Sequence, residues 1–201
     1  MAARRVGLLG GSFDPAHAGH RHISLEALRR LGLDEVWWLV SPQNPLKAPS
    51  ETPLADRLAA ARRVGDHPSI RVTDIERTLA TVYTADTLAQ LTRRFPGIRF
   101  VWIIGADNLI QICRWRRWRR IFATVPIAVF ARPPYSWKAL TGRAARRYAA
   151  FRVSEAQAGA LVGMRPPAWI FFHSRPHPES ATRIRAARNP KEGRRAGTPG
   201  V

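Results

Sequence analysis

Two histidines three residues apart, His17 and His20, follow a glycine-rich turn near the start of the chain. The turn lies between an apolar segment (6–9) and an amphipathic stretch (19–31) and consists of Gly10, Gly11, Ser12 and Phe13. Glycines let the backbone approach a ligand closely, and the N-terminus of a helix attracts anions. Histidines three residues apart share one face of a helix, so both can point at that anion. These residues therefore predict a site for the phosphates of a nucleoside triphosphate.

Each part of this pattern has a plainer interpretation when it is taken alone. A Gly-Gly pair is usually a turn, and a lone histidine is usually a surface or core residue. Together, residues 10–20 resemble the (H/T)xGH signature of the nucleotidyltransferase superfamily. In that superfamily the two histidines contact the triphosphate and stabilise the transition state. The resemblance implies transfer of a nucleotidyl group from a nucleoside triphosphate to a phosphate.

Length and composition indicate one globular domain. The 201 residues suit one hydrophobic core, and we expect a domain over 1–188 followed by a disordered basic tail over 189–201. No apolar run approaches the roughly 20 residues that a membrane span needs. The N-terminus does not resemble a secretory signal, and the single cysteine, Cys113, suits a reducing compartment. We therefore expect a cytoplasmic protein without a membrane partner.

Positive charge is concentrated in the second half of the chain. The net charge is +19, of which residues 112–201 hold 19 basic against 3 acidic side chains. Such a half could bind nucleic acid, steer anionic nucleotides towards a site, or reflect an arginine-rich composition. Residues 114–120 interleave arginine with tryptophan, but the apolar spacing of Ile112, Trp115 and Phe122 favours an amphipathic helix. A nucleic-acid partner is therefore not expected.

Strands and helices alternate along the chain, which indicates an α/β fold. The expected strands are 6–9, 35–40, 70–72 (continuing extended over 74–77), 100–104, 126–130 and 170–172. The expected helices are 19–31, from 52–53 to about 64, 85–94 with Thr84 as its cap, 137–150, 154–161 and 180–187. This alternation predicts a Rossmann-like, doubly wound parallel sheet with helices on both faces.

Polar residues gather where the expected strands end, which is where open parallel sheets bind ligands. In chain order they are His17 and His20, Asn44 and Lys47, Thr84, Gly105 with Asp107, Arg132, and Ser180 with Thr182 and Arg185. The six placements point to one site at one edge of the sheet.

The same elements resemble those of bacterial nicotinate-nucleotide adenylyltransferases, in family order and over nearly the whole chain. The matching elements are residues 10–20, 44–47, 84–88, 104–107, Trp115, 131–133 and 180–185. The family reaction joins ATP to nicotinate mononucleotide and releases deamido-NAD and pyrophosphate. The resemblance implies Mg²⁺ accompanying ATP, and no metal site made of protein side chains alone is expected.

The implied chemistry needs no enzyme nucleophile, because the 5′-phosphate of the mononucleotide is itself one. Transfer would then be direct and in line, and the enzyme would position the reactants and neutralise charge. The residues assigned to catalysis are His17, His20, Lys47 and Arg185. Taken alone, Ser180 could be a helix cap and Arg185 a surface residue. The residues expected to bind ATP are Gly10, Gly11, Ser12, Phe13, His17, His20, Gly105, Asp107 (through the ribose), Ser180, Thr182 and Arg185.

The second substrate is assigned to other strand ends. Asn44 and Lys47 are expected to bind the mononucleotide phosphate. By resemblance, Trp115 stacks on the pyridine ring, with Thr84 and Arg132 near its carboxylate. The chain departs from the family at Arg116-Arg117-Trp118, where many relatives carry an aromatic residue soon after the tryptophan. An adenylyltransferase acting on phosphopantetheine or nicotinamide mononucleotide is the alternative, and the oligomeric state stays open.

Overall fold

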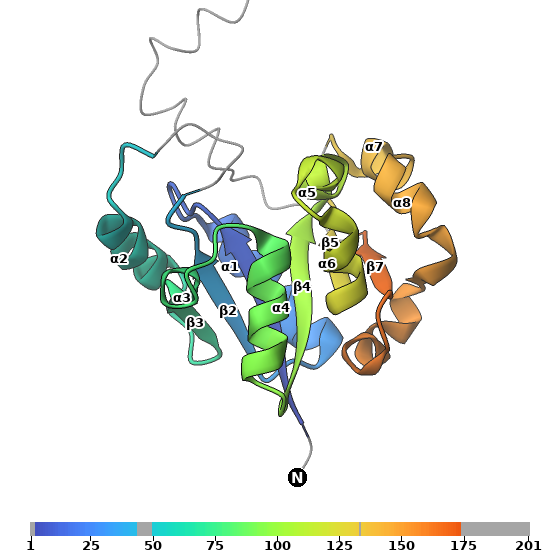
Figure 1. The fold of residues 1–201 in the computed structure, drawn as a ribbon, viewed down its shortest axis with the longest axis horizontal. Helices are drawn as coiled ribbons and strands as arrows, with labels where there is room; N and C mark the ends of the chain where they lie inside the picture. The colour runs from blue at the N-terminus through green and yellow to red at the C-terminus, as the bar shows by residue number, and fades with distance from the viewer. Residues whose placement is uncertain (1–2, 44–49, 133, 174–201) are drawn as a thin grey trace, which may run out of the picture.

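A parallel β-sheet forms the centre of the molecule (Figure 1). The computed structural model describes residues 3–43, 50–132 and 134–173. Within them, seven strands pair in the order β3-β2-β1-β4-β5-β7-β6, and every pairing is parallel. The strands are β1 (Arg4–Gly11), β2 (Glu35–Val40), β3 (Ile70–Thr73), β4 (Ile98–Gly105), β5 (Ile127–Phe130), β6 (Arg152–Val153) and β7 (Trp169–Phe172). The α/β class and the doubly wound sheet predicted from the sequence are confirmed.

Helices cover both faces of this sheet (Figure 1). The α-helices are α1 (Ala18–Leu31), α2 (Leu54–Val64), α3 (Ile75–Thr78), α4 (Thr84–Arg94), α5 (Ala106–Gln111), α6 (Trp118–Thr124), α7 (Ser136–Leu140) and α8 (Arg143–Arg147). Three 3-10 helices are also described: η1 (Ile112–Arg114), η2 (Ala149–Phe151) and η3 (Glu155–Gly163). None of the helices in the described ranges has the length and apolar character needed to cross a membrane.

The strands are apolar on both sides because each side faces a layer of helices. In β4, Phe100 and Trp102 pack with α4, α5 and α6, whereas Val101 and Ile103 pack with α1 and η3. Side chains of a strand point alternately to its two faces, so a continuous apolar run is what a doubly covered strand requires. This explains why the central strands could be located from the sequence.

The order of strands reverses between β1 and β4. From β1 the chain moves outwards through β2 and β3, and it then returns to β4 on the other side of β1. In open parallel sheets the ligand crevice lies outside the carboxyl ends of the strands at this reversal. The loops that follow β1 and β4 therefore border the expected site.

Four local predictions were wrong. Residues 74–77 do not continue the third strand, because α3 begins at Ile75. Tyr83, not Thr84, occupies the N-cap position of α4. The helix expected over 137–150 is divided into α7 and α8, with Gly142 at the N-cap of α8. The helix expected around Trp115 is interrupted before α6, where Arg117 adopts a left-handed backbone conformation (φ 54°).

One strand was not predicted, one helix is of a different type, and two predictions concern residues outside the described ranges. The two-residue strand β6 was not expected, and residues 155–163 form a 3-10 rather than an α-helix. The helix predicted over 180–187 and the tail predicted over 189–201 lie outside the described residues.

Candidate active site

The loop between β1 and α1, residues 12–17, ends at His17, and His20 follows in the first turn of α1. His17 is the N-cap of α1, and its backbone N–H donates a hydrogen bond to Nδ1 of His20 at 3.2 Å. The two imidazole rings lie with centroids 3.9 Å apart. The structure therefore brings the two histidines together at the start of a 14-residue helix, as the spacing predicted. A helix N-terminus of this kind favours an anion.

His20 is a neutral hydrogen-bond donor. Burial, together with the nearby His17 and Arg132, lowers the pKa of His20 to about 3. Because Nδ1 accepts the backbone N–H, the proton of the neutral ring is assigned to Nε2. The sequence left open whether His20 acts as a cation or as a donor, and its surroundings favour the neutral donor.

The ring of Phe13 packs between those of His20 and Trp38. Phe13 is 2% exposed and packs on Trp38 at 5.0 Å and beside His20 at 4.7 Å between ring centroids. Trp38 Nε1–H donates to Ser24 Oγ, and the Ser24 hydroxyl donates to the carbonyl of His20, each at 2.8 Å. The side chain of Phe13 thus belongs to the core. Sequence reasoning missed Trp38 and Ser24, whose only signal was their place in apolar elements.

The glycines of this loop are required partly by packing within the sheet. A Cβ at Gly10 would lie 2.4 Å from the ring of Trp102 on β4. The Gly11 carbonyl accepts the backbone N–H of Ser41 at 2.9 Å, which joins the loop to the end of β2. Gly10 therefore permits the close pairing of β1 and β4, in addition to any approach of a ligand.

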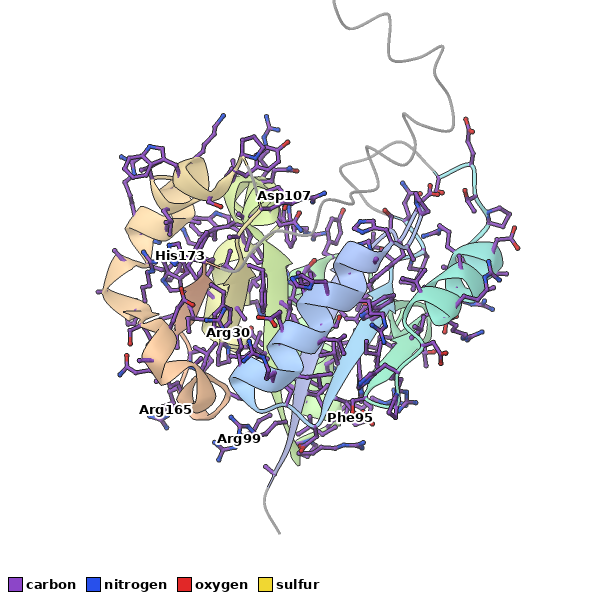
Figure 2. The ribbon with its side chains drawn as sticks, turned by 180° about the vertical axis from the view of Figure 1, so that it is seen from behind. Arg30, Phe95, Arg99, Asp107, Arg165 and His173 are labelled. Atoms are coloured by element: carbon purple, nitrogen blue, oxygen red, sulfur yellow. The ribbon has the colours of Figure 1, made fainter. Side chains whose placement is uncertain are left out.

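On the β4 side of the reversal of strand order, Asp107 and Arg132 form an ion pair. Arg132 Nη1 donates to Asp107 Oδ2 at 2.8 Å, and Figure 2 shows Asp107 in α5, just after the end of β4. The other carboxylate oxygen, Oδ1, is buried and has no hydrogen-bond partner among the described residues. A Cβ at Gly105 would lie 2.5 Å from that oxygen. The site thus holds one oriented, unused acceptor, of the kind a ribose hydroxyl would need.

Arg132 was predicted in the nicotinate pocket, and the structure groups it with Asp107. It also lies near enough to His20 to affect the charge of that imidazole. The pairing connects the residues after β5 with the start of α5, which follows β4. Sequence reasoning found both partners but not their pairing, because it joins residues 25 positions apart.

The residues next to Thr84 contact the residues that follow Trp115. Arg117 Nη1 pairs with Asp86 at 3.2 Å, and the Arg116 guanidinium lies 4.6 Å from the ring centre of Tyr83. Trp115 is half-buried against the helix-covered face of the sheet that carries α4 and α6. The structure thus brings the start of α4 to the 115–117 turn, as a shared pocket would require.

A buried carboxyl, Glu76, was missed because its segment was expected to be extended. It is 6% exposed on α3 and accepts a hydrogen bond from the Thr87 hydroxyl at 3.2 Å. Burial raises the pKa of Glu76, while hydrogen bonds from Ser41 and Thr87 oppose that rise. This carboxyl connects the end of β2 with the first turns of α4.

Five assigned residues, Asn44, Lys47, Ser180, Thr182 and Arg185, lie outside the described residues, and their roles stay predictions. In the part of the chain that is described, no three His, Cys, Asp or Glu side chains gather as a metal site. The described site is therefore a pair of facing loops, with histidine donors on one and a fixed carboxylate on the other.

Comparison with known proteins defines the class first. A family model described as cytidylyltransferase-like matches residues 8–187. Among solved structures, a Plasmodium falciparum nicotinic acid mononucleotide adenylyltransferase complexed with NaAD has the same fold. Its TM-score is 0.66 at 16% identity, over 90% of this chain and 82% of that chain.

Curated relatives are much more similar in sequence. A protein of Cereibacter sphaeroides named "Probable nicotinate-nucleotide adenylyltransferase" is 56% identical over 90% of this chain and 96% of its own length. One from Ruegeria pomeroyi with the same name is 53% identical over 90% of this chain and 85% of its own length. The chain therefore belongs to the cytidylyltransferase-like family and, within it, to the nicotinate-nucleotide adenylyltransferases.

Proposed function

We propose that this chain transfers the adenylyl group of ATP to the 5′-phosphate of nicotinate mononucleotide, giving deamido-NAD and pyrophosphate. The observation that carries the proposal is the arrangement of side chains at the carboxyl ends of β1 and β4, where the strand order reverses. On one side lie His17 and His20 at a helix N-terminus, and on the other lies the fixed carboxylate of Asp107. Family membership supports the same substrates.

The transfer is direct and proceeds in line at the α-phosphorus of ATP. An oxygen of the mononucleotide phosphate forms the new P–O bond as the bond to the pyrophosphate oxygen breaks. His20 donates from Nε2 to the α-phosphate, where charge develops in the transition state, and His17 lies beside it. No covalent enzyme intermediate forms, because the acceptor is already a nucleophile.

Asp107 accepts a hydrogen bond from the ATP ribose through its free Oδ1, while Arg132 holds the other oxygen. Lys47 and Arg185 supply further positive charge, with Asn44 at the mononucleotide phosphate and Ser180 and Thr182 at the triphosphate. Mg²⁺ enters with ATP as part of the substrate and neutralises phosphate charge. Phosphate oxygens and water hold it, because magnesium is commonly bound through substrate phosphates.

The testing experiment measures pyrophosphate release from ATP and Mg²⁺ with three acceptors in parallel. These are nicotinate mononucleotide, nicotinamide mononucleotide and phosphopantetheine. Preference for the nicotinate form is the expected result. Preference for another acceptor would overturn the pocket assigned to Thr84 and Trp115 but retain the chemistry. No pyrophosphate release with any of the three acceptors would overturn the proposed function.

A further inference from the structure

Arg57 of α2 is a buried arginine whose partners are backbone carbonyl groups. It is 3% exposed, and its guanidinium donates hydrogen bonds to four carbonyl oxygens. These belong to Ser12 at 2.7 Å, Ser41 at 2.8 Å, Pro42 at 3.1 Å and Thr52 at 3.2 Å. Burial lowers the pKa of Arg57, and the nearby Asp14 carboxylate raises it. A guanidinium suits this task because its donors are held in one planar fork.

The four carbonyls come from two loops, and the proposed reaction requires a fixed position of one loop relative to the other. Ser12 belongs to the loop that ends on His17. The other three belong to the segment between β2 and α2 (residues 41–53): two at its start and one near its end. Along the sequence, Asn44 and Lys47 lie between those two anchored ends. One side chain therefore joins the loop before α1 to both ends of the segment after β2.

Asp14 makes a second connection between the same loops. Its Oδ1 accepts a hydrogen bond from the Thr52 hydroxyl at 3.0 Å, and its Oδ2 accepts one from the Ser50 hydroxyl at 2.7 Å. Beside Pro15, an aspartate is commonly a turn residue, and here its carboxylate also reaches partners 36 and 38 positions along the chain. Asp14 stands three residues before His17 on the same loop.

We propose that Arg57 and Asp14 are positioning residues for adenylyl transfer, because together they fix residues 41–42 and 50–52 against the loop that ends at His17. This inference rests on the proposed function, in which one loop takes the triphosphate and the other takes the mononucleotide phosphate. Neither residue contacts the reacting atoms. Their connection sets the separation of the attacking oxygen from the α-phosphorus.

The proposal predicts that turnover depends on Arg57 more strongly than ATP binding does. A displacement of about 1 Å between reacting groups can reduce a rate about 100-fold. Lysine keeps the charge but cannot reach four divergent carbonyls. We therefore expect Arg57→Lys to lower kcat about 100-fold. The Kd for ATP, which needs only one of the two loops, should change less than about threefold, well under the tenfold of one hydrogen bond.

The experiment compares the wild type with Arg57→Lys, Thr52→Val and a control, Arg62→Lys. Arg62 lies on the same helix but is exposed, so its substitution should leave kcat within twofold of the wild type, as distant surface changes do. Thr52→Val keeps the shape of the side chain and removes one hydrogen bond to Asp14. It should lower kcat about tenfold, the scale of one such bond. The measurements are kcat and KM for each substrate, the Kd for ATP by calorimetry, and Tm.

A merely structural role gives a different set of results. If Arg57→Lys lowers Tm but leaves kcat per folded molecule within twofold of Arg62→Lys, the proposal is overturned. If Arg57→Lys does not fold, Thr52→Val decides: a kcat within twofold of the wild type overturns the proposal. If the wild type itself releases no pyrophosphate with nicotinate mononucleotide, the proposed function fails, and Arg57 loses its role with it.

Discussion

At the scale of single residues, His20 connects the start of α1 with the chemistry of the site. In the proposed reaction its Nε2–H meets charge that grows on the α-phosphate. Removing one such transition-state donor costs about 10²–10³ in kcat. We expect His20→Ala to lower kcat at least about 100-fold in a pyrophosphate-release assay. His67→Ala, on the loop before β3, is the control, and wild-type turnover in His20→Ala would exclude the assigned role.

The low pKa of His20 also makes stability depend on pH. The pKa of His20 is about 3 in the folded chain, below the ordinary histidine value of 6.5, so the unfolded chain binds more protons between these two pH values. Stability is therefore full above pH 6.5 and is lost as the pH falls towards 3. Between pH 7 and pH 5 the contribution of His20 should fall by about 2 kcal/mol. Urea unfolding at pH 7 and pH 5 should show that the free energy of unfolding falls less between these pH values in His20→Gln than in the wild type.

Gly105 offers a test of the Asp107 carboxylate that does not replace Asp107 itself. A Cβ at Gly105 would overlap Asp107 Oδ1, whereas a Cβ at Gly97 meets nothing within 4 Å. Gly105→Ala should displace the oxygen assigned to the ribose and weaken ATP binding about tenfold, the scale of one hydrogen bond. Calorimetry with ATP measures the change, with Gly97→Ala as its matched control. Equal ATP affinities in the two variants would argue against the ribose contact.

The residues that the sequence revealed are those with a motif or a place at a strand end. His17, His20, Gly105 and Asp107 were found in this way, and the structure places them after or at the carboxyl ends of β1 and β4, where the strand order reverses. Their supports were not found. Arg57 and the pairing of Asp107 with Arg132 depend on tertiary contacts that no local spacing encodes.

At the scale of elements, a buried hydrogen-bond chain fixes α1 to β2. Trp38 of β2 donates to Ser24 of α1, which in turn donates to the His20 carbonyl. Ser24→Ala leaves a buried indole N–H without its acceptor, so it should cost about 1–3 kcal/mol of unfolding free energy. Thr141→Ala removes an exposed hydroxyl bonded to a carbonyl four residues back and should cost less than about 0.5 kcal/mol. Urea denaturation compares them, and equal losses would contradict a special role for the chain.

The bounds of an element could be predicted from the sequence where burial determines them. They could not be predicted where the backbone conformation of a single residue determines them. The strand over 35–40 was predicted with the bounds that the structure has, because its apolar run faces helices on both sides. The apolar spacing around Trp115 equally suits a helix, but the left-handed conformation of Arg117 interrupts it. Residues 74–77 carry too short a pattern to distinguish one helical turn from an extended strand end.

At the scale of the whole molecule, the excess of positive charge separates an enzyme from a nucleic-acid-binding module. Most of that charge lies in residues 112–201, and the basic tail predicted over 189–201 carries part of it. Every residue assigned to the proposed reaction lies at or before Arg185 in the sequence. A chain ending at Arg188 should therefore keep kcat within about twofold of the full chain.

The same truncation gives a different result if nucleic acid is the true partner. Non-specific nucleic-acid affinity comes from phosphate contacts and falls steeply with salt. The removed segment holds three basic residues, Lys191, Arg194 and Arg195, so a binding module should lose affinity and salt dependence with it. The decisive comparison measures pyrophosphate release and single-stranded RNA binding at two salt concentrations, for both chain lengths. Turnover kept in the shorter chain supports the enzyme. Lost turnover, together with tight RNA binding by the full chain alone, would contradict it, because no residue assigned to the reaction lies beyond Arg185 in the sequence.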